Sequence, residues 1–105
     1  MYYTFALIFY LTQACLGEVT PNFRRIYISI REKNIHVYFF LEDFNEEDIS
    51  NIESEIMFYF QNYIDDQEEL ESYKVTHEIV LGKDGYIKSA DGDLTQIFHR
   101  KEETL

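Results

Sequence analysis

The sequence has few of the residues that stabilise secreted or fibrous chains. It holds one cysteine, Cys15, so no disulfide forms within the chain, and a small chain without disulfides is typical of a reducing compartment. One proline and four glycines in 105 residues argue against a disordered or collagen-like chain. This length is typical of one domain, so we expect residues 1–105 to fold as a single unit.

Basic residues are also scarce. Nine Lys and Arg stand against twenty Asp and Glu, which gives a formal net charge of −11. A surface of this sign repels nucleic acid and anionic lipid, because proteins bind both through basic residues. The composition therefore predicts no nucleic-acid or membrane partner, and it predicts long-range attraction to a basic protein.

Motifs for catalysis and cofactor binding are absent from the sequence. It contains no glycine-rich phosphate loop, no paired cysteines and no His-Glu-x-x-His. We therefore expect a protein that is not an enzyme and that needs no cofactor or metal. The alternative is a small metal-binding or catalytic protein that uses His77 and His99, whose strand parity would let them meet on one face. Hydrogen-bonded sheet histidines are the favoured interpretation, because metal-ligand spacing is missing.

Residues 4–18, TFALIFYLTQACLGE, form the first apolar segment. The apolar run is shorter than the roughly 20 residues of a membrane span, and no basic leader precedes it as in a secretory signal. We interpret the segment as a buried amphipathic helix that ends at Gly17. The expected buried stripe is Phe5, Ile8, Leu11 and Cys15, widened by Leu7, Ala14 and Leu16.

Residues 24–43 alternate between apolar and polar positions, which predicts a β-hairpin. Its turn is expected at residues 32–34, with Asn34 accepting the positive φ that such turns need. The inward positions are Ile26, Ile28, Ile30, Ile35, Val37, Phe39 and Leu41. Tyr38 and Phe40 lie on the other face, so that face is either covered or exposes an aromatic patch.

Residues 44–64 predict a second helix, with Asn45 as its N-cap and a stripe of Ile49, Ile52, Ile56, Phe60 and Tyr63 or Ile64. A third strand follows at residues 73–81 and a fourth around residues 94–101, with turns at Asp84–Gly85 and Asp91–Gly92. The fold class is therefore α+β, in the order α-β-β-α-β-β. We expect a mostly antiparallel four-stranded sheet packed by two helices.

Acidic residues are concentrated in the centre of the chain. Between Asn34 and Tyr73 there is no Lys or Arg, and twelve of the twenty acids lie there. A solvated helix face is one interpretation; a surface that binds a cationic protein is the other, because a one-signed field steers such a partner. The candidate binding residues are Glu42, Asp43, Glu46, Glu47, Asp48, Asp65, Asp66, Glu68, Glu69 and Glu71, with Tyr38 and Tyr59 as possible aromatic anchors.

Three segments resemble one family of small bacterial proteins: LGEVTPNFR at residues 16–24, FNEEDISNIESEI at residues 44–56, and FHRKE at residues 98–102. Members share a GxVTPNxR-like signature, an acidic helix start and a basic-acidic ending, whereas residues 82–93 depart from that pattern. Some members resemble immunity proteins of contact-dependent growth inhibition systems. The resemblance implies that Pro21 and Asn22 form a structural turn, with Arg24 tethering it to a carboxylate.

The resemblance also implies a partner. Such immunity proteins bind and neutralise a cognate toxin domain, often an RNA-cleaving nuclease, and some of these toxins act with elongation factor Tu. Elongation factor Tu would then be an indirect partner, reached through the toxin. The expected location is the cytoplasm, and the acidic composition is compatible with this role.

Overall fold

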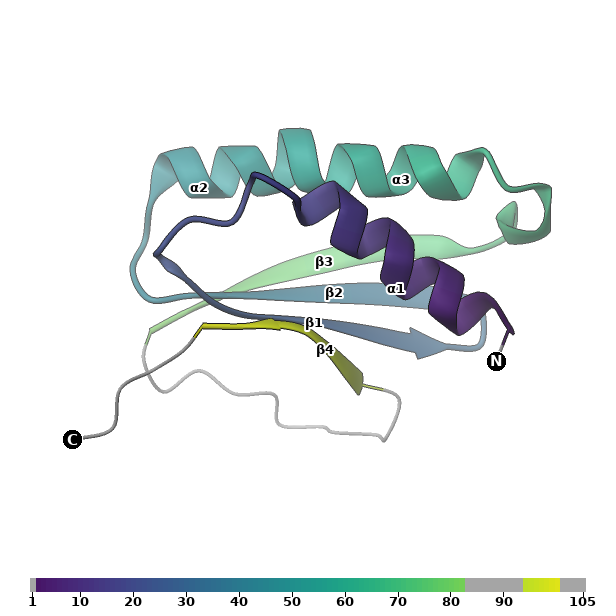
Figure 1. The fold of residues 1–105 in the computed structure, drawn as a ribbon, viewed down its shortest axis with the longest axis horizontal. Helices are drawn as coiled ribbons and strands as arrows, with labels where there is room; N and C mark the ends of the chain where they lie inside the picture. The colour runs from purple at the N-terminus through teal and green to yellow at the C-terminus, as the bar shows by residue number, and fades with distance from the viewer. Residues whose placement is uncertain (1, 83–93, 101–105) are drawn as a thin grey trace.

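The computed structural model describes residues 2–82 and 94–100, and Figure 1 shows their arrangement. The helical elements are α1 (Tyr2–Cys15), α2 (Glu46–Asn51), the π-helical η1 (Ile52–Ile56), α3 (Met57–Asp65) and the 3₁₀ helix η2 (Glu68–Leu70). The strands are β1 (Phe23–Arg31), β2 (Asn34–Leu41), β3 (Lys74–Leu81) and β4 (Leu94–His99). The expected turns at Asp84–Gly85 and Asp91–Gly92 lie outside the described residues.

The four strands form one sheet in the spatial order β3-β2-β1-β4. β1 pairs antiparallel with β2 and with β4, whereas β2 and β3 are parallel. The structure is therefore α+β with a mixed sheet, and the antiparallel expectation is wrong for β2 and β3. The order also differs from a plain α-β-β-α-β-β succession, because the second helical region has three segments and η2 follows it.

The connection between β2 and β3 explains their parallel pairing. α2, η1 and α3 form one continuous rod over residues 46–65, about 30 Å long at about 1.5 Å per residue. The eight residues of β2 cover a similar length, so the rod returns the chain to the end where β2 begins. Hydrogen bonds from Lys74 N to Lys33 O (2.8 Å) and from Gly82 N to Leu41 O (3.0 Å) fix both ends of the parallel pair.

Both helical regions lie on the same side of the sheet, and the hydrophobic core fills the space between the two layers (Figure 1). β1 and β2 are central and supply most of the sheet's share, which is Phe23, Ile26, Ile28, Ile35, Val37, Phe39 and Leu41. Phe40 lies on the opposite face, where its ring contacts Tyr27 edge-on at 5.8 Å, and it is fully buried.

The rod begins and packs as the sequence predicts. Asn45 is the N-cap, and its Oδ1 accepts a hydrogen bond from Asp48 N at 2.9 Å. Ile52, Ile56, Phe60 and Ile64 form the buried stripe, while Tyr63 stays on the surface.

A π-helical turn keeps that stripe on one face. Side chains that repeat every four residues on an α-helix shift around the helix axis by about 40° per repeat, because four residues exceed one turn of about 3.6. In η1, Met57 N–H bonds to Ile52 O, five residues back, so the turn is wider. The wider turn offsets the shift and holds Ile52 and Phe60 against the same core.

α1 buries part of the expected stripe and leaves two of its members on the surface. Leu7, Leu11, Ala14 and Cys15 are buried, whereas Phe5 is 75% exposed and Leu16 is 65% exposed. The helix is apolar nearly all round, so periodicity alone does not identify the buried side. None of the helices in residues 2–82 and 94–100 is long and apolar enough to cross a bilayer.

The hairpin turn also differs in one residue. The loop between β1 and β2 consists of Glu32 and Lys33, because Arg31 pairs directly with Asn34. Glu32 takes the positive φ of 56°, so the expectation that Asn34 supplies it is wrong.

Burial of Cys15 predicts an unreactive thiol. Desolvation raises the pKa of Cys15 from 9.0 to about 12, with the Glu18 charge as a smaller cause. At pH 8 the thiolate population should therefore fall about a thousandfold, and iodoacetamide should alkylate the folded chain correspondingly slowly. The folded thiol keeps its proton above pH 9 while the unfolded thiol loses it, so this group's contribution to stability is lost as the pH rises from about 9 to about 12. Intact-mass kinetics test this, and equal alkylation rates for folded and urea-unfolded chains would contradict it.

Candidate functional site

The rod divides the central acidic block into two clusters. The N-terminal cluster precedes and opens α2 and comprises Glu42, Asp43, Glu46, Glu47 and Asp48. The C-terminal cluster closes α3 and surrounds η2; it comprises Asp65, Asp66, Glu68, Glu69 and Glu71. The two clusters lie at opposite ends of the rod (Figure 1), about 30 Å apart. Between them the rod carries Glu53 and Glu55.

Asp48 in the N-terminal cluster is a structural residue. It is only 5% exposed, and its two carboxylate oxygens accept hydrogen bonds from Thr20 Oγ1 and Asn22 Nδ2, both at 3.1 Å. The prediction that Asp48 contributes to a binding surface is therefore wrong. Its carboxylate instead joins the connection between α1 and β1 to the first turn of α2.

The turn at residues 20–22 receives further support. Asn22 Nδ2 also donates to Asp43 O at 2.9 Å, and Asp43 N donates back to Asn22 Oδ1 at 3.0 Å. Arg100 donates to Pro21 O at 2.9 Å and forms an ion pair with Glu42 at 2.8 Å. Glu42 is thus engaged within the fold through its carboxylate, and Asp43 only through its backbone, so Asp43, Glu46 and Glu47 are the exposed acids of this cluster.

The turn is tethered to a carboxylate through its own Thr20 and Asn22, whereas the expectation gave this role to Arg24. The carboxylate of Asp48 meets Thr20 and Asn22, whereas the buried Arg24 donates from Nη1 to Gly82 O at 3.0 Å. The signature residues at positions 20–22 therefore serve the fold, as their turn role implies.

The C-terminal cluster opposes the stability of its own helix. Negative charge is unfavourable at a helix C-terminus, and the last turn of α3 contains no basic residue. Asp65 accepts one hydrogen bond from Gln61 Nε2 at 2.9 Å, and all five acids are exposed. Within residues 2–82 and 94–100, no Lys or Arg forms an ion pair with them. Their placement therefore contributes little to the stability of the fold.

Charge is segregated between the two layers of the molecule. The helical layer contains nine acids and no Lys or Arg; the acids are Glu46, Glu47, Asp48, Glu53, Glu55, Asp65, Asp66, Glu68 and Glu69. The basic residues of the described chain lie in the sheet layer: Arg24, Arg25, Arg31, Lys33, Lys74 and Arg100. The outer surface of the helices therefore carries a field of one sign.

The two proposed aromatic anchors lie on opposite faces. Tyr59 projects from α3 and is 48% exposed. Tyr38 is on β2, on the sheet face away from the helices, and its ring meets His36 edge-on at 4.6 Å. They cannot act as one anchor pair, and Tyr59 is the one that belongs to the acidic helical layer.

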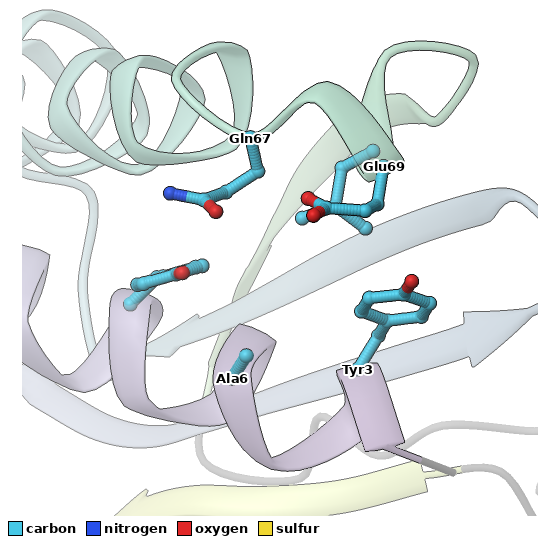
Figure 2. A pocket seen from close by; sticks show the side chains of 6 residues that line it. Tyr3, Ala6, Gln67 and Glu69 are labelled. Atoms are coloured by element: carbon cyan, nitrogen blue, oxygen red, sulfur yellow. The ribbon is translucent and has the colours of Figure 1, made fainter.

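A hollow opens where the start of α1 meets η2, beside the C-terminal cluster. Its volume is about 180 Å³, and it is lined by Tyr3, Ala6, Tyr10, Gln67, Glu69 and Leu70. Figure 2 shows Tyr3 and Ala6 rising from α1 toward Gln67 and Glu69 on the opposite wall. No pattern in the sequence indicates this hollow, since its two walls lie more than fifty residues apart along the chain.

The histidines do not assemble into a site. His77 is on β3 and His99 on β4, which are the two opposite edges of the sheet. His77 Nε2 lies 3.6 Å from Glu53 Oε2, while His36 contacts Thr76 at 2.6 Å and Glu78 at 3.0 Å. In the part of the chain that the structure describes, no three His, Cys, Asp or Glu side chains are placed to hold a metal. The alternative function based on His77 and His99 is therefore wrong.

Fold and surface together define a small two-layer α+β protein with a one-signed, aromatic-rich helical face. The chain belongs to the MafI2 immunity protein family, whose model matches residues 5–102. It is therefore an immunity protein for a toxin, an inhibitor rather than an enzyme. The resemblance to immunity proteins is confirmed at this level, while the contact-dependent inhibition type stays a prediction. Comparison with curated proteins gives no significant match.

Asp48 and its neighbour Glu47 provide a matched test of structural and surface roles. Asp48→Ala should lower the free energy of unfolding by about 2–3 kcal/mol, because it removes a buried carboxylate that accepts hydrogen bonds from the half-buried Thr20 and Asn22. Glu47→Ala, on the exposed side of the same turn, should change it by less than about 0.5 kcal/mol. Urea denaturation measures both values, and equal effects would contradict the structural assignment of Asp48.

Proposed function

We propose that this immunity protein neutralises a cationic, RNA-cleaving toxin domain delivered by contact-dependent growth inhibition, and that it binds the toxin through its acidic helical layer. The observation that carries the proposal is the segregation of charge: nine acids and no Lys or Arg lie in the helical layer. A nuclease must hold phosphates with Lys and Arg, so its active site is cationic. Carboxylates on the helical layer are the complementary groups.

The acidic surface is smaller than the ten residues predicted from the sequence. Asp48 is buried and Glu42 is paired with Arg100. The exposed members are Asp43, Glu46, Glu47, Asp65, Asp66, Glu68, Glu69 and Glu71. These acids steer the encounter, while apolar contacts determine the residence time.

The location of the immunity protein follows from the target of the toxin, and its other partners follow from its net charge. The toxin acts on RNA in the cytoplasm, so the immunity protein acts there too. Its net charge of −11 disfavours direct binding to RNA or to anionic membrane. If the toxin acts with elongation factor Tu, that factor meets the immunity protein only through the toxin.

The test uses the purified cognate toxin domain. An equimolar amount of the immunity protein should abolish RNA cleavage, and the association rate constant should fall steeply as salt is raised. Full cleavage activity in excess immunity protein would overturn the proposal.

Paired charge variants locate the steering field. Asp65→Asn/Asp66→Asn removes two charges from the helical layer and should slow association about 3–10-fold at low salt. Glu32→Gln/Glu78→Gln removes two charges from the sheet layer and serves as the control. Stopped-flow measurements compare the two, and equal slowing would contradict binding through the helical layer.

A further inference from the structure

The outer surface of the helical layer exposes large aromatic side chains. We define the aromatic band as Phe5 and Phe9 of α1 with Phe58, Tyr59 and Tyr63 of α3. Their exposed fractions are 75%, 56%, 55%, 48% and 37%, respectively. Exposed aromatics of this number on one face are unusual for a monomer and mark interaction surfaces.

The aromatic band is continuous across both helices. Tyr10 joins the two halves, because its ring stacks on Tyr63 at 5.6 Å and 22° and meets Phe9 edge-on at 6.2 Å. Tyr59 lies one turn before Tyr63 on α3 and contacts Phe58 at 5.6 Å. Phe5 lies one turn before Phe9 on α1 in the same way.

One end of the aromatic band leads to the hollow. Tyr10 belongs to both features, since it stacks on Tyr63 and also lines the hollow with Tyr3 and Glu69. Tyrosine ring faces attract cations, and a carboxylate beside them adds an ion pair. A volume of about 180 Å³ has the scale of one side chain rather than of a separate ligand.

Charge identifies the occupant of this face. α1 contains no charged residue, and every charged residue of the rod is acidic. Nothing on this helical face therefore attracts a second acidic chain. A copy of this protein with its net charge of −11 would be repelled. A cationic protein with an apolar centre is complementary, because the acids at the end of α3 form a polar edge on one side of the aromatic band.

We propose that the toxin docks on the aromatic band and inserts one Lys or Arg side chain into the hollow, between the tyrosine rings and Glu69. This inference rests on the proposed function and deepens it by naming the docking face. Tyr59 and Phe9 are the apolar anchors, and Glu69 pairs with the inserted cation. The N-terminal acidic cluster, at the far end of the rod, contributes only to long-range attraction.

Substitutions of exposed residues test the proposal without disturbing the core. Tyr59→Ala and Phe9→Ala remove anchors, and together they should weaken toxin binding about 30-fold or more. Glu69→Gln keeps the shape of the hollow, removes its charge and should weaken binding about tenfold. The matched controls are Phe44→Ala, an aromatic residue 68% exposed outside the band, and Glu78→Gln on β3 in the sheet layer; both should stay within about threefold of wild type.

Isothermal titration with the purified toxin domain gives the affinities, and thermal unfolding checks that each variant remains folded. Controls that weaken binding as much as the band variants would overturn the docking face. Band variants that bind like wild type, while wild type still neutralises the toxin, would overturn this inference and leave the proposed function intact. Wild type that fails to bind would overturn the proposed function itself. A wild-type dimer that Tyr59→Ala dissociates would assign the band to a second copy and would also overturn the inference.

Discussion

The helical layer depends on one buried carboxylate. Asp48 stands in the first turn of α2, where the helix dipole favours negative charge, and both of its oxygens accept hydrogen bonds from the segment that links α1 to β1. The same residue donates its backbone N–H to the N-cap Asn45. One side chain thus fixes the end of one helical region relative to the start of the other. The contact between α1 and α3, and with it the outer surface of both helices, follows from that junction.

The two ends of the rod show different uses of the same residue type. At the N-terminal end, acids complement the helix dipole or complete hydrogen bonds of the fold. At the C-terminal end, Asp65 and Asp66 oppose the dipole, and no basic residue occupies the last turn. Natural proteins retain unfavourable local choices mainly where function requires them. The energetic contrast separates structural acids from candidate binding acids, although the composition of the two clusters is nearly the same.

The sequence predicts much of the fold and less of the surface. Alternation identifies the inward residues of β1 and β2, and the polar start at Asn45 identifies the N-cap. The alternation of apolar and polar residues does not indicate the direction in which a strand runs. The parallel pairing of β3 with β2 depends on the rod, which returns the chain to the end of the sheet where β2 begins. In α1, apolar residues on every side allow several stripes, and the structure leaves Phe5 and Leu16 of the expected one on the surface.

Residues that depend on tertiary contacts were beyond prediction for the same reason. In the sequence, Asp48 is indistinguishable from the neighbouring surface acids. Its contacts with Thr20 and Asn22 in the structure show that it is buried. Tyr3 and Glu69 meet across the chain because α1 runs back along the rod (Figure 1). His77 and His99 share a parity in the sequence, yet two strands separate them in the sheet.

The π-helical turn at Ile52–Ile56 has a consequence for how the chain tolerates changes in length. Such a turn holds one residue more than an α-helix needs, so deleting a single residue there restores regular winding and leaves both flanks facing as before. The same deletion in α3 would rotate the residues beyond it by about 100° and expose half of the buried stripe. Relatives that differ by one residue in this helix should therefore carry the gap in this short segment, with the core and the outward aromatic side chains preserved on either side.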